Sequence, residues 1–383
     1  MNILITGIHG FVGTNLVNVL KAQHTIYGLD IVAPQKEGVT KTYTWAELET
    51  IPAVDVVIHL AGKAHDTKNQ TNAQVYFDIN TGLTQKIYDW FLSSEAKKFI
   101  FFSSVKAAAD RVEGDILTED VVPSPKGPYG ESKIAAENYI LSKAVSGKRQ
   151  VVRSEEQVVS SKQQVVSSKR QAVRSEEQET RGKNQESRTK NQDLREDSQL
   201  PTNNSLLQTT DFKLPTTNFP LSTEKKTYIL RPCMIHGPGN KGNLNLLYQV
   251  VRKGIPYPLG AFENRRSFTS VDNLSFVIEQ LIEKDIPTGI YNVGDDETLS
   301  TNELIALMAK MLDKPNRTWN WNKSLVQFCA RVGTVLHLPL NTERLQKLTE
   351  NYVVSNAKLK LALGIEKMPV RAEDGLRKTV GSF

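Results

Sequence analysis

Tyr129 and Lys133 stand four residues apart in the segment PYGESK, a spacing that could carry proton and hydride chemistry. Residues four apart share one face of a helix. An ammonium beside a phenol favours the phenolate, so the spacing predicts that the tyrosine pKa is lowered. Such a tyrosine can take a proton from a hydroxyl group while hydride leaves the same carbon. Ser103 and Ser104, which end the apolar stretch KKFIFFSS, offer a hydroxyl partner.

A glycine-rich segment, TGIHGFVG, follows the first apolar run of the chain. Gly7 would permit a tight turn, Gly10 a close approach of backbone to a pyrophosphate, and Gly13 close helix packing. The unpaired N–H groups of a following helix would face the phosphates. Because the segment follows an expected strand and opens an expected helix, it predicts a dinucleotide-binding site.

Asp30 ends the second apolar run, HTIYGLD. A carboxylate there can accept both adenine-ribose hydroxyls and would repel a 2′-phosphate, which favours NAD over NADP. Residues 31–35 contain no Arg or Lys that would suit NADP. The alternative is an ordinary solvated aspartate in a turn.

The elements that must position these groups alternate between strand and helix over residues 1–143. Expected strands lie at 1–7, 24–30, 55–62 and 97–104, and expected helices at 13–23, 80–92 and 128–141. This alternation predicts an α/β fold, a Rossmann doubly wound parallel sheet of about seven strands with helices on both faces. Segments 226–235 and 289–294 are expected to return to that sheet. A smaller C-terminal α/β substrate domain would complete the fold.

Residues 150–199 interrupt this pattern with a recurring seven-residue unit led by glutamine, as in QVVRSEE and QAVRSEE. Its valines are adjacent, which does not give the spaced apolar seam of a coiled coil. A polar tract without aromatic residues cannot bury enough surface to order itself. We therefore expect a disordered heptad-repeat insert and linker over 144–225. The expected domains are 1–143, continued by about 226–237 and 267–294, and a substrate-binding domain of 238–266 and 295–383.

The composition is that of a globular protein, with 39% hydrophobic and 23% charged residues among 383. Residues 148–226 hold 15 Lys/Arg and 11 Asp/Glu, a net +4 of the chain's +6, so no basic face for nucleic acid is expected. No apolar run is long enough for a membrane span, and the N-terminus lacks the pattern of a signal peptide. Two cysteines are too few for a disulfide framework or a metal cluster, which favours the cytoplasm and no metal site.

Together these motifs resemble the extended short-chain dehydrogenase/reductase family, the NAD-dependent epimerases, dehydratases and reductases of nucleotide sugars. TGIHGFVG resembles the family's TGxxGFxG loop, DVVIHLAG its fourth-strand signature, and FIFFSS with PYGESK its Ser/Thr and YxxxK motifs. LRPCMIHGPG resembles RPxxxYGP, with His236 where tyrosine is usual, and NRRSFTSVDNL resembles R-x-F-x-x-V-x-D. The resemblance covers about 1–143 and 226–380.

The resemblance implies roles for particular residues and a homodimer. Ser104, Tyr129 and Lys133 would be catalytic. Ser104 is chosen over Ser103 because its distance of 25 residues from Tyr129 matches the family's usual spacing. Arg266, with Arg265 as second choice, would hold the nucleotide diphosphate, and Ser104 and Asn243 would contact the substrate. The cofactor would contact Gly7, His9, Gly10, Phe11, Val12, Gly13, Asp30, Leu60, Ala61, Gly62, Asn80 and Lys133.

Several positions depart from the family pattern or leave alternatives open. The segment SSVKAAAD lacks the family's Tyr-Gly, so the sugar is not identified, and Lys106 is either a substrate contact or a solvated lysine. Asn80 either supports the backbone or a water near the tyrosine, or is an ordinary helix residue. Asn243 is either a ligand or a loop residue. Val105 and Lys106 replace the acidic pair of the family's dehydratases, which disfavours dehydration.

Hydride transfer at C4 of a nucleotide sugar is the activity that the resemblance implies. The C-terminal segment LTENYVVSNAKLKLALG resembles the UDP-glucose 4-epimerase-like proteins of surface-polysaccharide pathways. The first expectation is an NAD-dependent epimerase of a UDP-hexose or UDP-N-acetylhexosamine, since an epimerase recycles tightly held NAD. An NAD(P)H-dependent 4-keto reductase of a UDP-deoxysugar remains open, as does a non-catalytic NAD-binding sensor or scaffold.

Overall fold

The computed structural model describes residues 1–63, 72–144, 225–240, 242–336 and 341–383. The chain divides into two units, and the first holds residues 1–145 and 217–383. The second unit, and with it nearly all of the expected 144–225 insert, lies outside the described residues.

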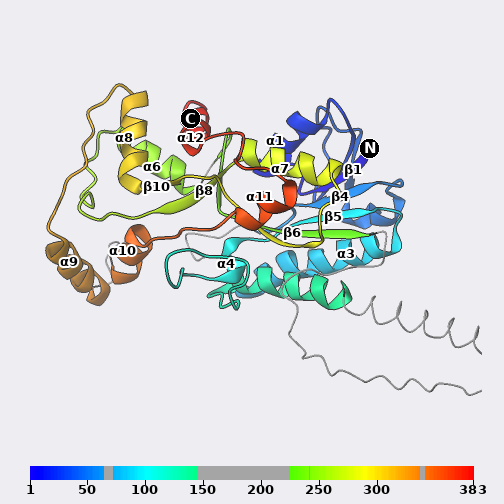
Figure 1. Ribbon diagram of the computed structural model, residues 1–383, viewed down its shortest axis with the longest axis horizontal. Helices are drawn as coiled ribbons and strands as arrows, with labels where there is room; N and C mark the ends of the chain where they lie inside the picture. Colours follow the sequence, from blue (N-terminus) through cyan, green and yellow to red (C-terminus); the bar gives the residue numbers. More distant parts are fainter. Residues whose placement is uncertain (64–71, 145–224, 241, 337–340) are drawn as a thin grey trace, which may run out of the picture. The chain divides into compact units, whose positions relative to one another are not determined.

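A seven-stranded sheet forms the centre of this unit (Figure 1). All of its strand pairs are parallel. Its order is β3-β2-β1-β4-β5-β6-β9. The strands are β1 Asn2–Thr6, β2 Thr25–Asp30, β3 Lys41–Thr44, β4 Val56–His59, β5 Lys98–Phe102, β6 Lys226–Pro232 and β9 Gly289–Val293. The expected doubly wound α/β fold is confirmed, and the two late segments return to the sheet as β6 and β9.

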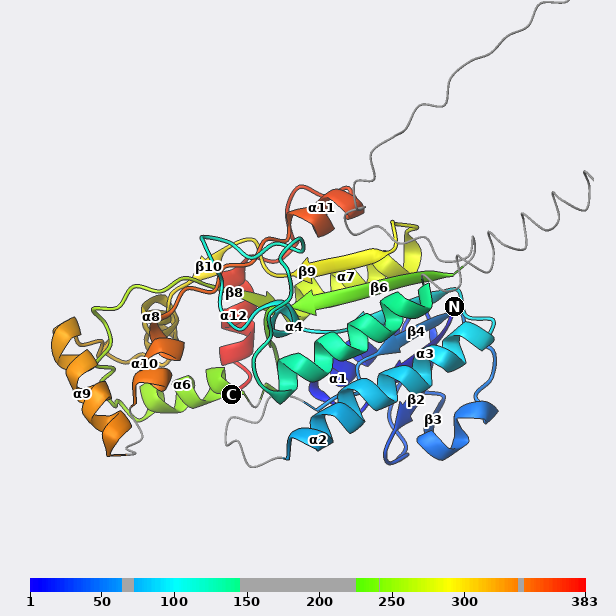
Figure 2. The ribbon, with the colours of Figure 1, turned by 90° about the horizontal axis from the view of Figure 1, so that it is seen from below.

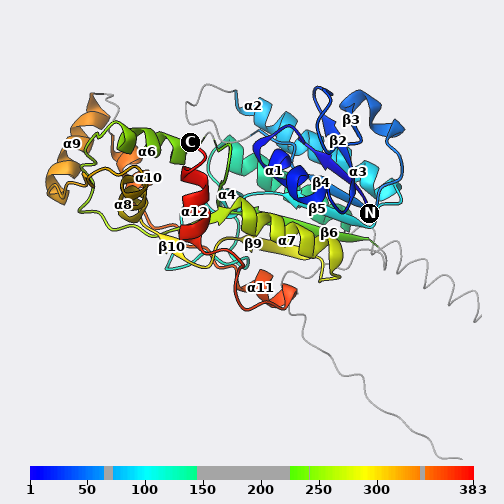
Figure 3. The ribbon, with the colours of Figure 1, turned by 90° about the horizontal axis from the view of Figure 1, so that it is seen from above.

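Helices cover both faces of this sheet because its strands are apolar on both sides. One core contains Ile3 and Ile5 of β1 with the apolar sides of α1 Phe11–Leu20 and α7 Val271–Glu283 (Figure 3). The other contains Leu4 with α3 Leu83–Ser93 and a helix at 128–144 (Figure 2). The alternation of side chains along each strand thus supplies two separate cores.

The expected helix at 80–92 is wrong at its start. A helix begins at Ala73 as α2 Ala73–Tyr76, passes through a π-helical segment Phe77–Gly82, and continues as α3. Asn80 lies in the π-helical segment. Such segments are rare and often accompany functional sites, and no hydrophobic period in the sequence reveals them.

A second sheet of three strands, in the order β10-β8-β7, lies in the C-terminal part (Figure 1). Its strands are β7 Met234–His236, β8 Arg266–Ser270 and β10 Thr298–Leu299. The sequence predicts that residues 267–294 continue the Rossmann domain. Residues 267–270 instead lie in this small sheet, whereas α7 packs on the large sheet. The remaining helices are a 3-10 helix Trp45–Thr50, α4 Val105–Ala108, α6 Asn243–Arg252, α8 Thr301–Met311, α9 Lys323–Val335, α10 Thr342–Thr349, α11 Ala357–Leu363 and α12 Ala372–Val380.

Candidate active site

The glycine loop between β1 and α1 is a tight turn that leaves no room for side chains. Gly7 has φ +68°, and a Cβ there would lie 2.8 Å from the backbone nitrogen of Ala61. A Cβ at Gly13 would lie 2.7 Å from the Gly7 oxygen and 2.8 Å from the Ile8 oxygen. Turn and close packing therefore require glycine at both positions, as the sequence predicts for them.

The start of α1 presents donors that no side chain caps. Gly10 is the N-cap and has no side chain to bond the first N–H groups of the helix. Beside it, Asp30 accepts hydrogen bonds from the backbone N–H groups of His9 at 3.1 Å and Ile31 at 2.8 Å. Uncapped helix N–H groups suit a pyrophosphate, and a carboxylate at the end of β2 suits ribose hydroxyls. These residues fit a dinucleotide.

Other expected cofactor residues serve partly as packing. Val12 and Leu60 pack against the core of β1 and α1. The Phe11 ring lies 3.5 Å from the position that a Cβ would take at Gly237. The N–H of Ala61 donates to the Thr6 hydroxyl at 3.1 Å, which ties the end of β4 to β1.

Gly62 connects the cofactor loop to the catalytic helix. A Cβ at Gly62 would lie 2.9 Å from Oδ1 of Asn80 and 3.1 Å from Nζ of Lys133. Asn80 is fully buried and bonds the backbone of Lys63 in both directions, at 2.7 and 3.2 Å. It also donates to the Ser132 hydroxyl at 2.9 Å. Asn80 therefore supports the backbone, one of the two roles left open by the sequence.

Ser104 and Tyr129 are brought together as the sequence predicts. Ser104 is a buried N-cap of α4 that follows β5, and Tyr129 lies in the first turn of the helix at 128–144. A hydrogen bond joins the two side chains. The ring of Tyr76 meets that of Tyr129 edge-on, with 6.4 Å between centroids. The reactive phenol thus has a fixed position beside a hydroxyl group.

The expected lowering of the Tyr129 pKa is wrong for this structure. Burial raises the pKa of Tyr129, and the hydrogen bond with Ser104 lowers it by less. Lys133 is not among the groups that shift it. The cause is desolvation, which disfavours the phenolate and which the spacing of residues cannot express.

Lys133 is a buried lysine held by the end of β5. Its Nζ donates to the carbonyl oxygen of Phe102 at 2.8 Å and lies 5.2 Å from the centroid of the Phe101 ring. Burial lowers the pKa of Lys133 to about 8, although Glu137 acts in the opposite direction. Close by, burial and then Lys133 lower the pKa of His59 to about 3. His59 is therefore neutral near pH 7, bridging the hydroxyls of Thr6 at 2.6 Å and Thr84 at 2.9 Å.

The lowered pKa of Lys133 predicts how the free energy of unfolding depends on pH. The native protein loses this proton near pH 8 and the unfolded chain near 10.5, so between these values the unfolded state binds more protons. The free energy of unfolding of the wild type, relative to Lys133→Met, is expected to rise with pH there, by up to about 1.4 kcal/mol per pH unit. Urea unfolding from pH 7.5 to 10.5 measures it, with Lys126→Met at an exposed lysine as the control. A flat difference between wild type and Lys133→Met would contradict the lowered pKa.

A buried ion pair behind Lys133 was missed by sequence reasoning. Arg231 on β6 donates from Nε and Nη2 to Glu137 at 3.0 and 2.6 Å, and both side chains are almost fully buried. The Ser103 hydroxyl also donates to Glu137. The four-residue spacing of Lys133 and Glu137 could have indicated that Glu137 lies on the same helix face as Lys133. Its partner Arg231, however, lies on a strand 94 residues further along the chain. Ser103 thus supports the site from behind, and Ser104 faces Tyr129.

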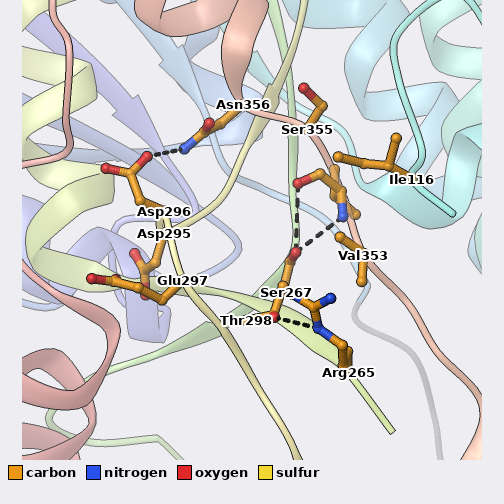
Figure 4. A pocket seen from close by; sticks show the side chains of 11 residues that line it. Ile116, Arg265, Ser267, Asp295, Asp296, Glu297, Thr298, Val353, Ser355 and Asn356 are labelled. Carbon is orange, nitrogen blue, oxygen red and sulfur yellow. Dashed lines mark hydrogen bonds between the residues drawn. The ribbon is translucent and has the colours of Figure 1, made fainter.

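Arg265 and Arg266 point to opposite faces of the start of β8. Arg265 lines a cavity of about 480 Å³ together with Ser267, Asp296 and Asn356 (Figure 4). Its Nε donates to the Thr298 hydroxyl at 3.2 Å. None of Ser104, Tyr129 and Lys133 lines this cavity.

Arg266 is half-buried on the other face. Its charge interacts with Glu350 and Tyr257 and, more weakly, with Lys106 next to Ser104. Of the two arginines, Arg266 is therefore the one whose charge acts on Lys106, two residues after Ser104. Its role toward a diphosphate remains a prediction.

The sequence also singled out Lys106, His236 and Asn243. Lys106 donates to the Asp110 carbonyl at 2.6 Å and lies 4.4 Å over the Tyr352 ring, so it is not a freely solvated lysine. His236 is buried and bonded to the Thr379 hydroxyl at 2.9 Å. Asn243 begins α6, but its side chain lies outside the described residues.

Lys36 is a cation near the expected ribose site. It lies one residue beyond the segment 31–35, which contains no Arg or Lys. Its Nζ donates to the Thr14 hydroxyl on α1 at 2.9 Å, and Asp30 attracts its charge.

Asp30→Asn is expected to weaken NAD binding by about tenfold or more, because a bond to a charged acceptor is lost. Fluorescence titration with NAD and NADP measures the effect, and Asp285→Asn, at an exposed carboxylate paired with Lys226 at the start of β6, is the control. Unchanged NAD affinity would remove Asp30 from the cofactor site.

This fold and loop define a dinucleotide-binding protein of the Rossmann class. Residues 3–153 match the model of the NAD dependent epimerase/dehydratase family. The chain is 26% identical to a UDP-glucose 4-epimerase of Vibrio cholerae over its whole length and 95% of that protein. It is 23% identical to an N-acetyl-α-D-glucosaminyl-diphospho-ditrans,octacis-undecaprenol 4-epimerase of Escherichia coli O157:H7, over 82% of this chain and 73% of that protein.

Solved structures agree on the fold. MoeE5 in complex with UDP-glucuronic acid and NAD superposes with a TM-score of 0.64 at 16% identity, covering 100% of this chain and 98% of that one. A UDP-glucose 4-epimerase of Thermotoga maritima with UDP-glucose gives a TM-score of 0.63 at 18% identity, with the same coverage. The N-terminal part of the chain, residues 3–153, is thus similar to the NAD dependent epimerase/dehydratase family.

Proposed function

We propose that the protein is an NAD-dependent nucleotide-sugar epimerase that inverts C4 of a UDP-hexose or UDP-N-acetylhexosamine. The observation that carries this proposal is the hydrogen-bonded pair Ser104–Tyr129 with Lys133 one turn further along the same helix. These groups connect through Gly62 to a glycine loop that fits a dinucleotide. The similarity to 4-epimerases over the whole chain supports the same reaction.

NAD, when bound, supplies the hydride acceptor and afterwards the donor. The Tyr129 phenol oxygen takes the proton from the C4 hydroxyl, and the Ser104 hydroxyl bonds the same oxygen and holds it in place. Lys133, whose Nζ donates to the Phe102 carbonyl, would hold the ribose of bound NAD. The hydrogen bond with Ser104 is the contact that lowers the pKa of Tyr129. The 4-keto sugar then turns over in the site, and Tyr129 returns the proton on reduction at the opposite face.

Arg266 and Asn243 are the residues proposed to recognise the substrate. We propose that Arg266 binds the diphosphate, because it is the arginine whose charge interacts with the catalytic loop. Asn243 at the start of α6 remains a proposed substrate contact. We also propose that the enzyme is a homodimer, which the family resemblance supports, and that it acts in the cytoplasm. The two cysteines, Cys233 and Cys329, are unpaired, as suits a reducing compartment.

A 4-keto reductase is the second candidate, and Lys36 is the observation that favours it. A cation beside Asp30 and the start of α1 could accept the 2′-phosphate of NADPH. The purified protein, without added cofactor, is expected to interconvert UDP-glucose with UDP-galactose, or UDP-N-acetylglucosamine with UDP-N-acetylgalactosamine. Consumption of added NADH or NADPH with a UDP-4-keto sugar, and no interconversion, would establish the reductase instead.

A further inference from the structure

Helix α9 carries an apolar stripe that faces solvent. Its buried face is made of Val326, Ala330 and Gly333, which pack toward Leu259 and Leu345. A second face, the α9 stripe, exposes large apolar side chains spaced three or four residues apart, Leu325 53%, Phe328 61%, Val332 37% and Val335 76%, and is extended by the C-cap residue Leu336 61%. This spacing places them side by side on one helix face. Figure 1 shows α9 with α10 alongside it.

The segment that contains the stripe, residues 314–336, carries charges of one sign. Residues 314–336 contain Lys314, Arg317, Lys323 and Arg331 and neither Asp nor Glu. Lys314 and Arg317 donate to the backbone carbonyls of Arg252 and Gly254, so their charges are not neutralised by those contacts. The apolar stripe therefore lies in a segment that attracts anionic surfaces.

Two tryptophans lead into the helix. Trp319 and Trp321 stack with 6.3 Å between ring centroids and remain 49% and 46% exposed. Tryptophan has an apolar ring and a polar N–H, and it is enriched where water meets the acyl region of a bilayer. Their exposure next to the α9 stripe gives the segment both features of an interfacial helix.

We propose that α9 and the two tryptophans dock this protein onto an anionic lipid bilayer, with the α9 stripe lying in the plane of the interface. A 13-residue helix is about 20 Å long, too short to span a bilayer but sufficient to lie in it. Within the described residues no helix is long and apolar enough to cross a membrane. A symmetric contact between two copies is disfavoured, because it would bring the basic sets together without acidic partners.

Vesicle sedimentation of the full chain tests this docking. Wild-type protein is expected to pellet with vesicles of equal parts phosphatidylglycerol and phosphatidylcholine, and much less with phosphatidylcholine alone. The double variant Leu325→Gln/Phe328→Gln should lower the partition coefficient about tenfold or more, because buried apolar area sets interfacial binding. Lys323→Gln/Arg331→Gln should lower it about tenfold on the anionic vesicles only.

Leu361→Gln is the matched control, since Leu361 is 84% exposed on α11 and should leave sedimentation unchanged. Equal sedimentation of the wild type and Leu325→Gln/Phe328→Gln would overturn the proposal. So would a change in oligomeric state of that variant with no change in sedimentation, which would make the stripe an interface between copies. Turnover of soluble UDP-hexoses should be unchanged in all these variants, so failure of docking is distinguishable from failure of the proposed function.

Discussion

Replacement of Tyr129 by phenylalanine is expected to lower kcat by about a thousandfold while the protein still binds NAD. The substitution removes the oxygen that exchanges the C4 proton, and acid–base catalysis of this kind contributes about 10²–10⁴ in rate. It leaves the ring, which packs edge-on against Tyr76, and the helix at 128–144 in place. Turnover of UDP-hexoses and the NAD content of the purified variant measure the two effects.

Tyr76→Phe is the matched control, because it removes a neighbouring phenol oxygen and keeps the ring contact. It should change kcat by much less than the Tyr129 variant. Wild-type turnover in Tyr129→Phe would refute the assigned mechanism. A protein that retains its cellular function in this variant would be a sensor or scaffold rather than an enzyme.

Removal of one partner of the buried pair Glu137–Arg231 should destabilise the fold by about 3–5 kcal/mol, because an uncompensated charge remains buried. Arg231→Met removes two hydrogen bonds to Glu137 and leaves the one that the Ser103 hydroxyl donates. Equilibrium unfolding in urea at pH 7.5 measures the loss.

The double variant Glu137→Gln/Arg231→Met should be substantially more stable than Arg231→Met, since it removes both charges and keeps a partner for Ser103. Arg371→Gln, which breaks the exposed pair with Glu297, is the control and should cost no more than about 1 kcal/mol. Additive losses in the double variant would show that the pair is not the source of the effect.

The sequence was sufficient for those parts of the fold that depend on local pattern. Apolar runs identified six of the seven strands of the large sheet, all but the short and polar β3 Lys41–Thr44. The TGIHGFVG segment identified the turn that Gly7 makes with φ +68°. The four-residue spacing of Tyr129 and Lys133 placed both on one helix. These features follow from backbone sterics and helix geometry, which act within a few residues.

Properties that depend on burial could not be predicted in this way. The pKa of Tyr129 is raised because the packing around it excludes water, and no spacing of charges reports on that packing. Arg231 and Glu137 meet only because β6 lies beside the helix that carries Lys133, across 94 residues of chain. The π-helical segment that holds Asn80 likewise follows from tertiary packing rather than from a hydrophobic period.

The most direct test of the central claim follows the hydrogen at C4. A UDP-hexose carrying deuterium at C4 is incubated with the purified protein without added cofactor, and both C4 epimers are analysed by NMR. The account predicts that the epimers reach equilibrium and that deuterium remains at C4 of both, because hydride is taken and returned within one site. Interconversion with loss of deuterium to water, or no interconversion by a protein that retains NAD, would contradict it.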